Sequence, residues 1–290
     1  MSGDHGVLTS SPARRKPWVL LRTGHPVLSG YTAALLVLLP ALLIAFSIDE
    51  RTLLERNIWL KPIKFDLAIA FYLITLSLYA HLLPPSWRNS PRFNRYVAFV
   101  CVTVIIEMAW LIYAAAIGEV SHFNQSHPVL APVYFIMGLL AILLTSLSAV
   151  IGVGVLRHHE HSANPLIRYA VGYSLLVTAV LTVLTAGYLS SAPAQSHAVL
   201  PAGLSTLDRQ STIPLFGWLR EAGDLRVAHF FAMHALHAVP LAAVIGVLAL
   251  PRAWTTHVPF ARVAAIGLCT VYTAFVVFVF TQALAGKPFL

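Results

Sequence analysis

Seven runs of mostly apolar residues, each about 20 residues long, decide what this chain can fold into. A run of that length crosses a bilayer as a helix, whereas a strand of a membrane barrel needs only about 10 alternating residues. Only 10% of the 290 residues are charged, and a soluble domain has roughly 25%. Because lipid offers the backbone no hydrogen-bond partners, the sequence predicts an all-α, polytopic integral membrane protein, a seven-transmembrane-helix bundle.

The chain divides into two predicted regions. Residues 1–26 form a polar N-terminal tail with four basic residues and no clear signal-peptidase site, so the first helix is expected to stay uncleaved. Residues 27–290 form a single transmembrane domain. Its helices are predicted at 28–47, 65–83, 96–117, 129–156, 166–189, 226–250 and 263–283.

The distribution of basic residues predicts the orientation. With the N-terminus inside, 11 Lys and Arg residues fall on the inner side and 8 on the outer side. The loop at 118–128, which has none, falls outside. We therefore expect a cytoplasmic N-terminus in a multi-pass protein of a cell membrane, and the Ala-, Leu- and Arg-rich composition suggests a bacterial cytoplasmic membrane. The net charge of +8 arises at helix ends, so the expected partner is the lipid bilayer and not nucleic acid.

The sixth helix carries the most informative polar residues. His229, His234 and His237 lie in or near its first half, and ionisable groups inside a membrane helix mark a functional site by default. At about 100° per residue, His234 and His237 are about 60° apart and His229 and His237 about 80°. We therefore expect one broad polar face with His237 in its middle. Neither Cys101 nor Cys269 belongs to a CxxC pair, so no thiolate metal site is indicated.

Depth brings a carboxylate to the same level as two of these histidines. Glu107 lies about 15 Å from the outer end of the third helix, and His234 and His237 lie about 12 and 16 Å into the sixth. These three residues supply ligand types that suit a divalent metal ion. Haem ligation would instead use His229, His234 or His237 with a partner such as His122.

Two alternatives need no cofactor. Glu107 and His237 could titrate as a proton relay or transport site. Alternatively, the histidines bond to the backbone or to Ser and Thr side chains of neighbouring helices. Lys61 and Lys64 could extend to the lipid headgroups. Alternatively, together with Arg226 they form a basic entrance near the outer face that suits an anionic substrate, and the candidate substrate-binding residues are Lys61, Lys64, Asp66, Asp224 and Arg226. Asp224 is expected to cap the sixth helix, and Arg226 to pair with Asp66 or Glu119.

The segment Ser77–His81 resembles the Ser-x3-His motif of the alkaline ceramidase and adiponectin-receptor superfamily. The resemblance implies a seven-helix, zinc-dependent lipid amidohydrolase. It covers five residues and the number of helices, and the last predicted helix lacks the histidines of the family's second motif.

The leading hypothesis is a metal- or haem-binding membrane protein with a redox role, its cofactor being haem b or a divalent metal ion. The alternative is a small transporter or sensor of an anion or protons, and the amidohydrolase ranks third. The sequence does not decide whether the protein is an enzyme.

Overall fold

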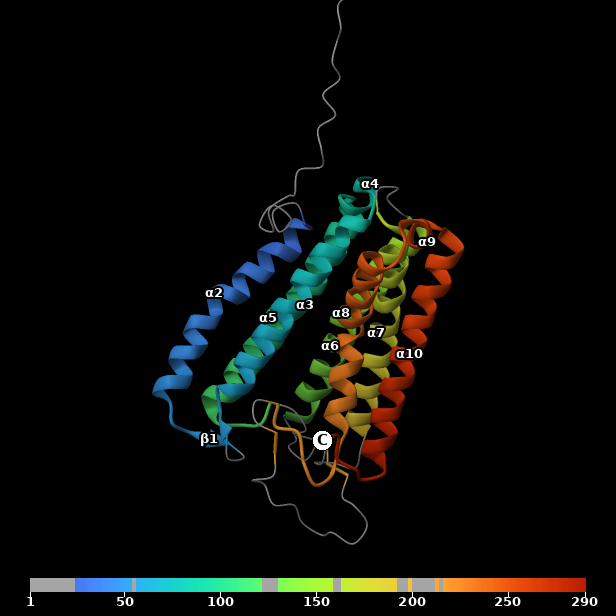
Figure 1. Ribbon diagram of the computed structural model, residues 1–290. Helices are drawn as coiled ribbons and strands as arrows, with labels where there is room; N and C mark the ends of the chain where they lie inside the picture. Colours follow the sequence, from blue (N-terminus) through green and yellow to red (C-terminus); the bar gives the residue numbers. More distant parts are fainter. Residues whose placement is uncertain are drawn as a thin grey trace, which may run out of the picture.

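Seven long helices dominate the computed structural model, which describes residues 24–53, 56–121, 130–158, 163–191, 198–199, 212–213 and 216–290. Each is long and apolar enough to cross a membrane, which confirms the predicted bundle. They lie side by side in Figure 1. They are α2 (Pro26–Ile48), α3 (Leu60–Tyr79) continued by the 3-10 turn η1 (Ala80–Leu82), α5 (Pro91–Ile117), α6 (Leu130–Arg157), α7 (Pro165–Ser191), α8 (Leu225–Ala249) and α10 (Val258–Leu284).

Three of these helices, α3, α5 and α10, begin five residues before their apolar runs. Proline lies in the first turn of α5 and α10, where its missing N–H costs no hydrogen bond. Ser90 caps α5, because its side chain accepts a hydrogen bond from the Phe93 backbone N–H at 3.3 Å. The apolar runs underestimate the lengths of these helices, because the first turn of a helix at the membrane interface can consist of polar residues.

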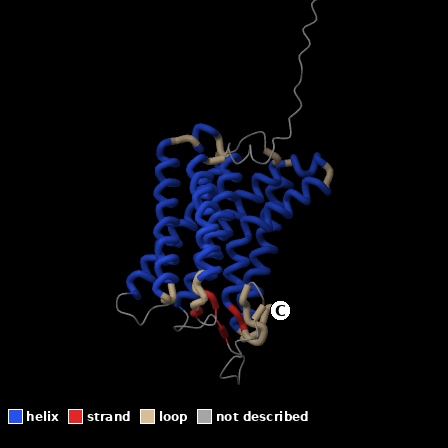
Figure 2. Tube along the Cα trace, turned by 90° about the vertical axis from the view of Figure 1, so that its left-hand side faces the viewer, coloured by secondary structure: helices blue, strands red, loops and turns tan. Residues whose placement is uncertain are grey.

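The remaining described elements are short and lie at the ends of the bundle. α4 (Pro85–Arg88) and α9 (Arg252–Thr256) lie at one end, which we call the α9 end. Two antiparallel pairs of two-residue strands lie at the other end, with the C-terminus, which we call the C-terminal end (Figure 2). These pairs are β1 (Thr52–Leu53) with β2 (Arg56–Asn57), and β3 (Ala198–Val199) with β4 (Gly223–Asp224).

Both α3 and α8 begin at the C-terminal end (Figure 1). This end therefore collects the starts of α3 and α8 and the end of α10. Gly223 allows two of these segments to approach closely, because any Cβ at this position would overlap the Ala283 carbonyl group. The assignment of this end to the outside of the membrane stays a prediction.

Small residues let α6 and α7 pack closely. A Cβ built on Gly152 would lie 2.9 Å from the carbonyl oxygen of Gly172, so the two helix backbones approach each other at this point. In contrast, α8 packs extensively against α7 and α10, and long side chains connect it to α3. The space between α3 and α8 is therefore bridged by side chains.

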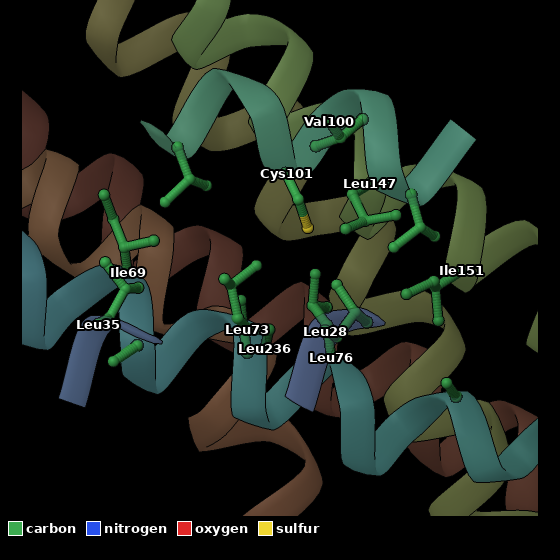
Figure 3. Packing of buried hydrophobic residues seen from close by; sticks show 14 of the residues in the cluster. Leu28, Leu35, Ile69, Leu73, Leu76, Val100, Cys101, Leu147, Ile151 and Leu236 are labelled. Carbon is green, nitrogen blue, oxygen red and sulfur yellow. The ribbon is translucent and has the colours of Figure 1, made fainter. Parts of the chain in front are cut away.

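The largest apolar cluster lies among α2, α3, α5 and α6, with contributions from α7 and α8 (Figure 3). Leu73, Leu76 and Leu147 are fully buried in it, and Cys101 is buried there as a free thiol. Large apolar side chains also cover the outside of the bundle, for example Leu248, which is 82% exposed. An apolar exterior of this kind fits lipid and would not be soluble in water.

Candidate functional site

Two side-chain contacts join α3 to α8 in the interior of the bundle, and a third extends them along α8. His237 Nε2 lies 3.1 Å from Thr75 Oγ1, and His237 Nδ1 lies 3.1 Å from His234 Nδ1. The Phe71 ring stacks on the His237 ring at a centroid distance of 4.5 Å. We call His234, His237 and Thr75 the imidazole chain.

The hydrogens of the imidazole chain can be assigned from its neighbours. The Thr75 hydroxyl donates to the Phe71 carbonyl oxygen at 2.7 Å, so its oxygen can only accept from His237 Nε2. His237 Nδ1 then carries a lone pair and accepts from the N–H of His234 Nδ1. It follows that His234 Nε2 carries a lone pair that no described side chain uses.

The imidazole chain lies deep in the bundle. Thr75 is about 22 Å from the start of α3 and His237 about 18 Å from the start of α8, at 1.5 Å per residue. A bilayer core is about 30 Å thick, so these groups lie well inside the apolar region.

His229 belongs to a different interface. Its Nδ1 lies 2.9 Å from Thr185 Oγ1 of α7, whereas His237 contacts Thr75 of α3 and His234 contacts His237. The single polar face predicted for this helix is therefore divided between two neighbours, because His229 and His234 are about 140° apart. The expectation that histidines bond to Ser and Thr side chains of adjacent helices is confirmed for His229 and His237.

At the C-terminal end, Asp224 and Arg226 form a bidentate ion pair. Arg226 donates from Nε to Asp224 Oδ1 at 2.9 Å and from Nη2 to Oδ2 at 2.6 Å. Asp224 also caps α8, as predicted, by accepting from the Arg226 backbone N–H at 3.0 Å. The predicted pairing of Arg226 with Asp66 or Glu119 is wrong, because the Arg226 side chain pairs instead with Asp224, the capping residue two positions earlier in the chain.

Three cations lie near one another at this end. Lys64 interacts electrostatically with both Arg56 and Arg226. The Arg56 guanidinium packs against Gly217, whose φ of 71° and missing Cβ allow this approach. We call Arg56, Lys64 and Arg226 the basic mouth; Asp224 is the carboxylate bound to it.

The two carboxylates inside the bundle lie elsewhere. Asp66 is fully buried, and neither of its oxygens has a hydrogen-bond partner among the described residues. It follows Lys64 by two residues and so faces the core, not the basic mouth. Glu107 is 5% exposed and interacts electrostatically with Lys61. Its Oε1 has no hydrogen-bond partner in the described part of the chain.

The structure does not bring the predicted metal ligands together as a set. His234 and His237 are in contact, but Glu107 has Lys61 as its charged neighbour. Over the described ranges, no group of three or more His, Cys, Asp or Glu side chains could hold a metal ion. The predicted haem partner His122 lies outside the described residues.

Two imidazole nitrogens of α8 carry lone pairs that the described residues leave unused. His234 Nε2 is one. His229 Nε2 is the other, because the Thr185 hydroxyl donates to the Leu181 carbonyl oxygen and so accepts from His229 Nδ1. They lie on different faces of the helix. A single metal ion or haem could therefore take only one of these two nitrogens as a ligand.

Comparison of the chain with protein-family models, curated proteins and solved structures finds no match.

The structure also shows where the two residues of the amidohydrolase-like motif, Ser77 and His81, lie. Ser77 Oγ lies 2.9 Å from Ser29 Oγ of α2, and His81 Nδ1 lies 3.2 Å from the Arg88 guanidinium. His81 is therefore at the α9 end, opposite the start of α8.

Sequence reasoning missed Phe71, Thr75 and Arg56. A signal for the first two exists, because Lys64, Phe71 and Thr75 are spaced by seven and four residues and so lie within about 40° of one another on a helix. Arg56 gives no such signal, since it reaches the basic mouth from a short hairpin whose position depends on the tertiary fold.

Proposed function

We propose that this protein moves a small anion across the membrane together with a proton. The observation that carries the proposal is the pairing of a basic mouth at one end of α3 and α8 with an imidazole chain deeper between the same two helices. The two features lie along one face of α3, which carries Lys64 of the basic mouth, Phe71, and Thr75 of the imidazole chain.

The basic mouth suits the first step, which is capture of the anion. The basic mouth brings Arg56 and Arg226 near Lys64, and a cluster of cations raises the local concentration of anions. Arg226 is held by Asp224 and by the Gly217 carbonyl oxygen at 2.7 Å, so its guanidinium is fixed in position.

The imidazole chain suits the second step, which is compensation of the anion's charge inside the membrane. His234 Nε2 can take up a proton without breaking any of the hydrogen bonds that link His234, His237 and Thr75. Imidazole is the side-chain group whose ordinary pKa lies nearest neutral pH, which makes histidine a suitable proton carrier. A protonated His234 then offsets the charge of a monovalent anion beside it.

Flux measurements in proteoliposomes test the proposal. Vesicles contain the pH-sensitive dye pyranine, and chloride, phosphate or succinate is added outside. We expect at least one anion to acidify the interior with the wild-type protein. His234→Ala should abolish this signal, and His81→Gln, at the far end of α3, should keep it. A wild-type protein that moves none of these anions and no protons would contradict the proposal.

A haem or metal cofactor is the second candidate, favoured by the free lone pair of His234 Nε2. An absorption spectrum and elemental analysis of purified protein test it, with His234→Ala as the comparison. A Soret band or stoichiometric metal that disappears in the variant would establish the cofactor and replace the transport proposal. A Soret band or metal that persists would place the ligand elsewhere.

A further inference from the structure

A second basic cluster lies at the α9 end, away from the imidazole chain and the basic mouth. Arg168 Cζ lies 4.5 Å from the centre of the Tyr169 ring, which stacks on Tyr173 at 6.0 Å. The Tyr173 hydroxyl accepts a hydrogen bond from Arg262 Nε of α10 at 3.1 Å. A continuous series of two guanidinium groups and two phenol rings therefore connects α7 with α10.

Arg168 lacks a counter-charge among the described residues. It is only 7% exposed, and its Nε has no hydrogen-bond partner in the described part of the chain. Residues 163–173 and 250–262 contain no acidic residue. Arg168 also lies in the first turn of α7, where the helix dipole disfavours a cation. A buried guanidinium in this setting is costly unless an anion approaches it.

The same end contains an open hollow of ≈ 270 Å³ at the junction of α9 and α10. It is lined by Ala253, Trp254, His257 and Phe260. Trp254 is 55% exposed and contacts Phe260 at a ring-centroid distance of 5.7 Å. Exposed tryptophan at the end of membrane helices is typical of the level of the lipid headgroups.

α9 is held against α7 beside this cluster. Asn164 Nδ2 donates to Thr255 Oγ1 at 3.3 Å, and Asn164 Oδ1 accepts from the Leu166 backbone N–H at 2.9 Å. The N-termini of α7 and α10 thus meet α9 at one place, with positive dipole ends and with Arg168, Arg252 and Arg262 in the same segments.

We propose that the α9 end, between α7, α9 and α10, binds the phosphate group of an anionic phospholipid. Arg168 and Arg262 contact the phosphodiester, and Trp254 and Phe260 contact the glycerol and upper acyl region. Basic pockets between membrane helices recognise lipid headgroups in this way. The site is distinct from the proposed transport pathway, so either can fail without the other.

Native mass spectrometry of the detergent-solubilised full chain tests this site, with phosphatidylglycerol and phosphatidylcholine as probes. We expect phosphatidylglycerol to bind more tightly, and Arg168→Gln or Arg262→Gln to weaken its binding about fivefold each. Arg262 is exposed, so Arg262→Gln keeps the test valid if Arg168→Gln fails to fold. Arg95→Gln, an exposed arginine at the same end of the bundle, is the control and should bind normally.

Three results would overturn the proposal. One is equal binding of the two lipids by the wild-type protein. Another is an unchanged preference for phosphatidylglycerol in Arg262→Gln and in any Arg168→Gln that folds. The third is full displacement of the lipid by millimolar inorganic phosphate, which would make the free ion the ligand.

Discussion

The Tyr79 hydroxyl of α3 donates a hydrogen bond to the Leu236 carbonyl oxygen of α8 at 2.8 Å. Pro240 lies four residues after Leu236 in the same helix and has no N–H, so this carbonyl lacks its normal partner within α8. A carbonyl without a partner is costly in lipid, and Tyr79 supplies the missing donor. The contact also fixes α8 against α3 next to His237, which forms the imidazole chain.

Removal of the Tyr79 hydroxyl tests this relationship. Tyr79→Phe should lower the free energy of unfolding by about 1 kcal/mol, because it leaves the Leu236 carbonyl without a donor. In a Pro240→Ala background the new Ala N–H can bond to that carbonyl, so the same change should cost clearly less. Unfolding by SDS titration in mixed micelles measures both. An equal cost in the two backgrounds would show that Pro240 and Tyr79 are not linked.

The packing of α6 on α7 gives a second prediction. Gly152→Ala places a methyl group 2.9 Å from the Gly172 carbonyl oxygen, a backbone atom that cannot move aside without shifting a helix. We expect a loss of about 1–3 kcal/mol. Gly138→Ala in the same helix is the matched control, since a Cβ there meets nothing within 4 Å. If the two variants unfold alike, the close approach of α6 and α7 does not exist.

The cap of α8 can be separated from its charge. Asp224→Ala removes the acceptor for the Arg226 backbone N–H and should destabilise the protein by about 1 kcal/mol or more. Asp224→Asn keeps a capping oxygen and removes only the charge. The apparent melting temperature in detergent should therefore fall more for Ala than for Asn. An equal fall in both variants would assign the stabilisation to the ion pair and not to the cap.

His25, just before α2, makes stability depend on pH. Burial lowers its pKa below 6.5, against the opposing effect of its hydrogen bond to Asn94, and the Arg88 charge lowers it further. Because the unfolded chain binds a proton more readily, stability should be complete above pH 6.5 and decline as the pH falls toward the lowered value.

The melting temperature as a function of pH, wild type beside His25→Gln, checks this effect. The variant should lose part of the decline between neutral and mildly acidic pH. Arg92→Gln, an exposed change at the same end, should keep the wild-type profile. An identical decline in His25→Gln would assign the pH dependence to other groups.

Much of the fold follows from the sequence, because an apolar run has one stable form in lipid and its length fixes its span. The Asp224 cap is also predictable, since it depends on residues next to each other in the chain. The side-chain partners of Glu107 and Arg226 are not predictable in this way. Depth along a helix places Glu107 level with His234, but which side of α5 faces α8 depends on packing between helices. Hydrogen-bond partners such as Thr75 and Tyr79 likewise come from a helix far away in sequence.

In the proposed function, Thr75 and the two histidines act together in proton-linked anion movement. The most direct test compares Thr75→Val with Thr182→Val in the pyranine vesicle assay. Both replace a buried threonine by an isosteric apolar residue, but the Thr182 hydroxyl has no hydrogen-bond partner among the described residues. We expect anion-dependent acidification to fall about fivefold in Thr75→Val, the equivalent of one hydrogen bond, and to stay at the wild-type rate in Thr182→Val. Equal rates in both variants and the wild type would contradict the account.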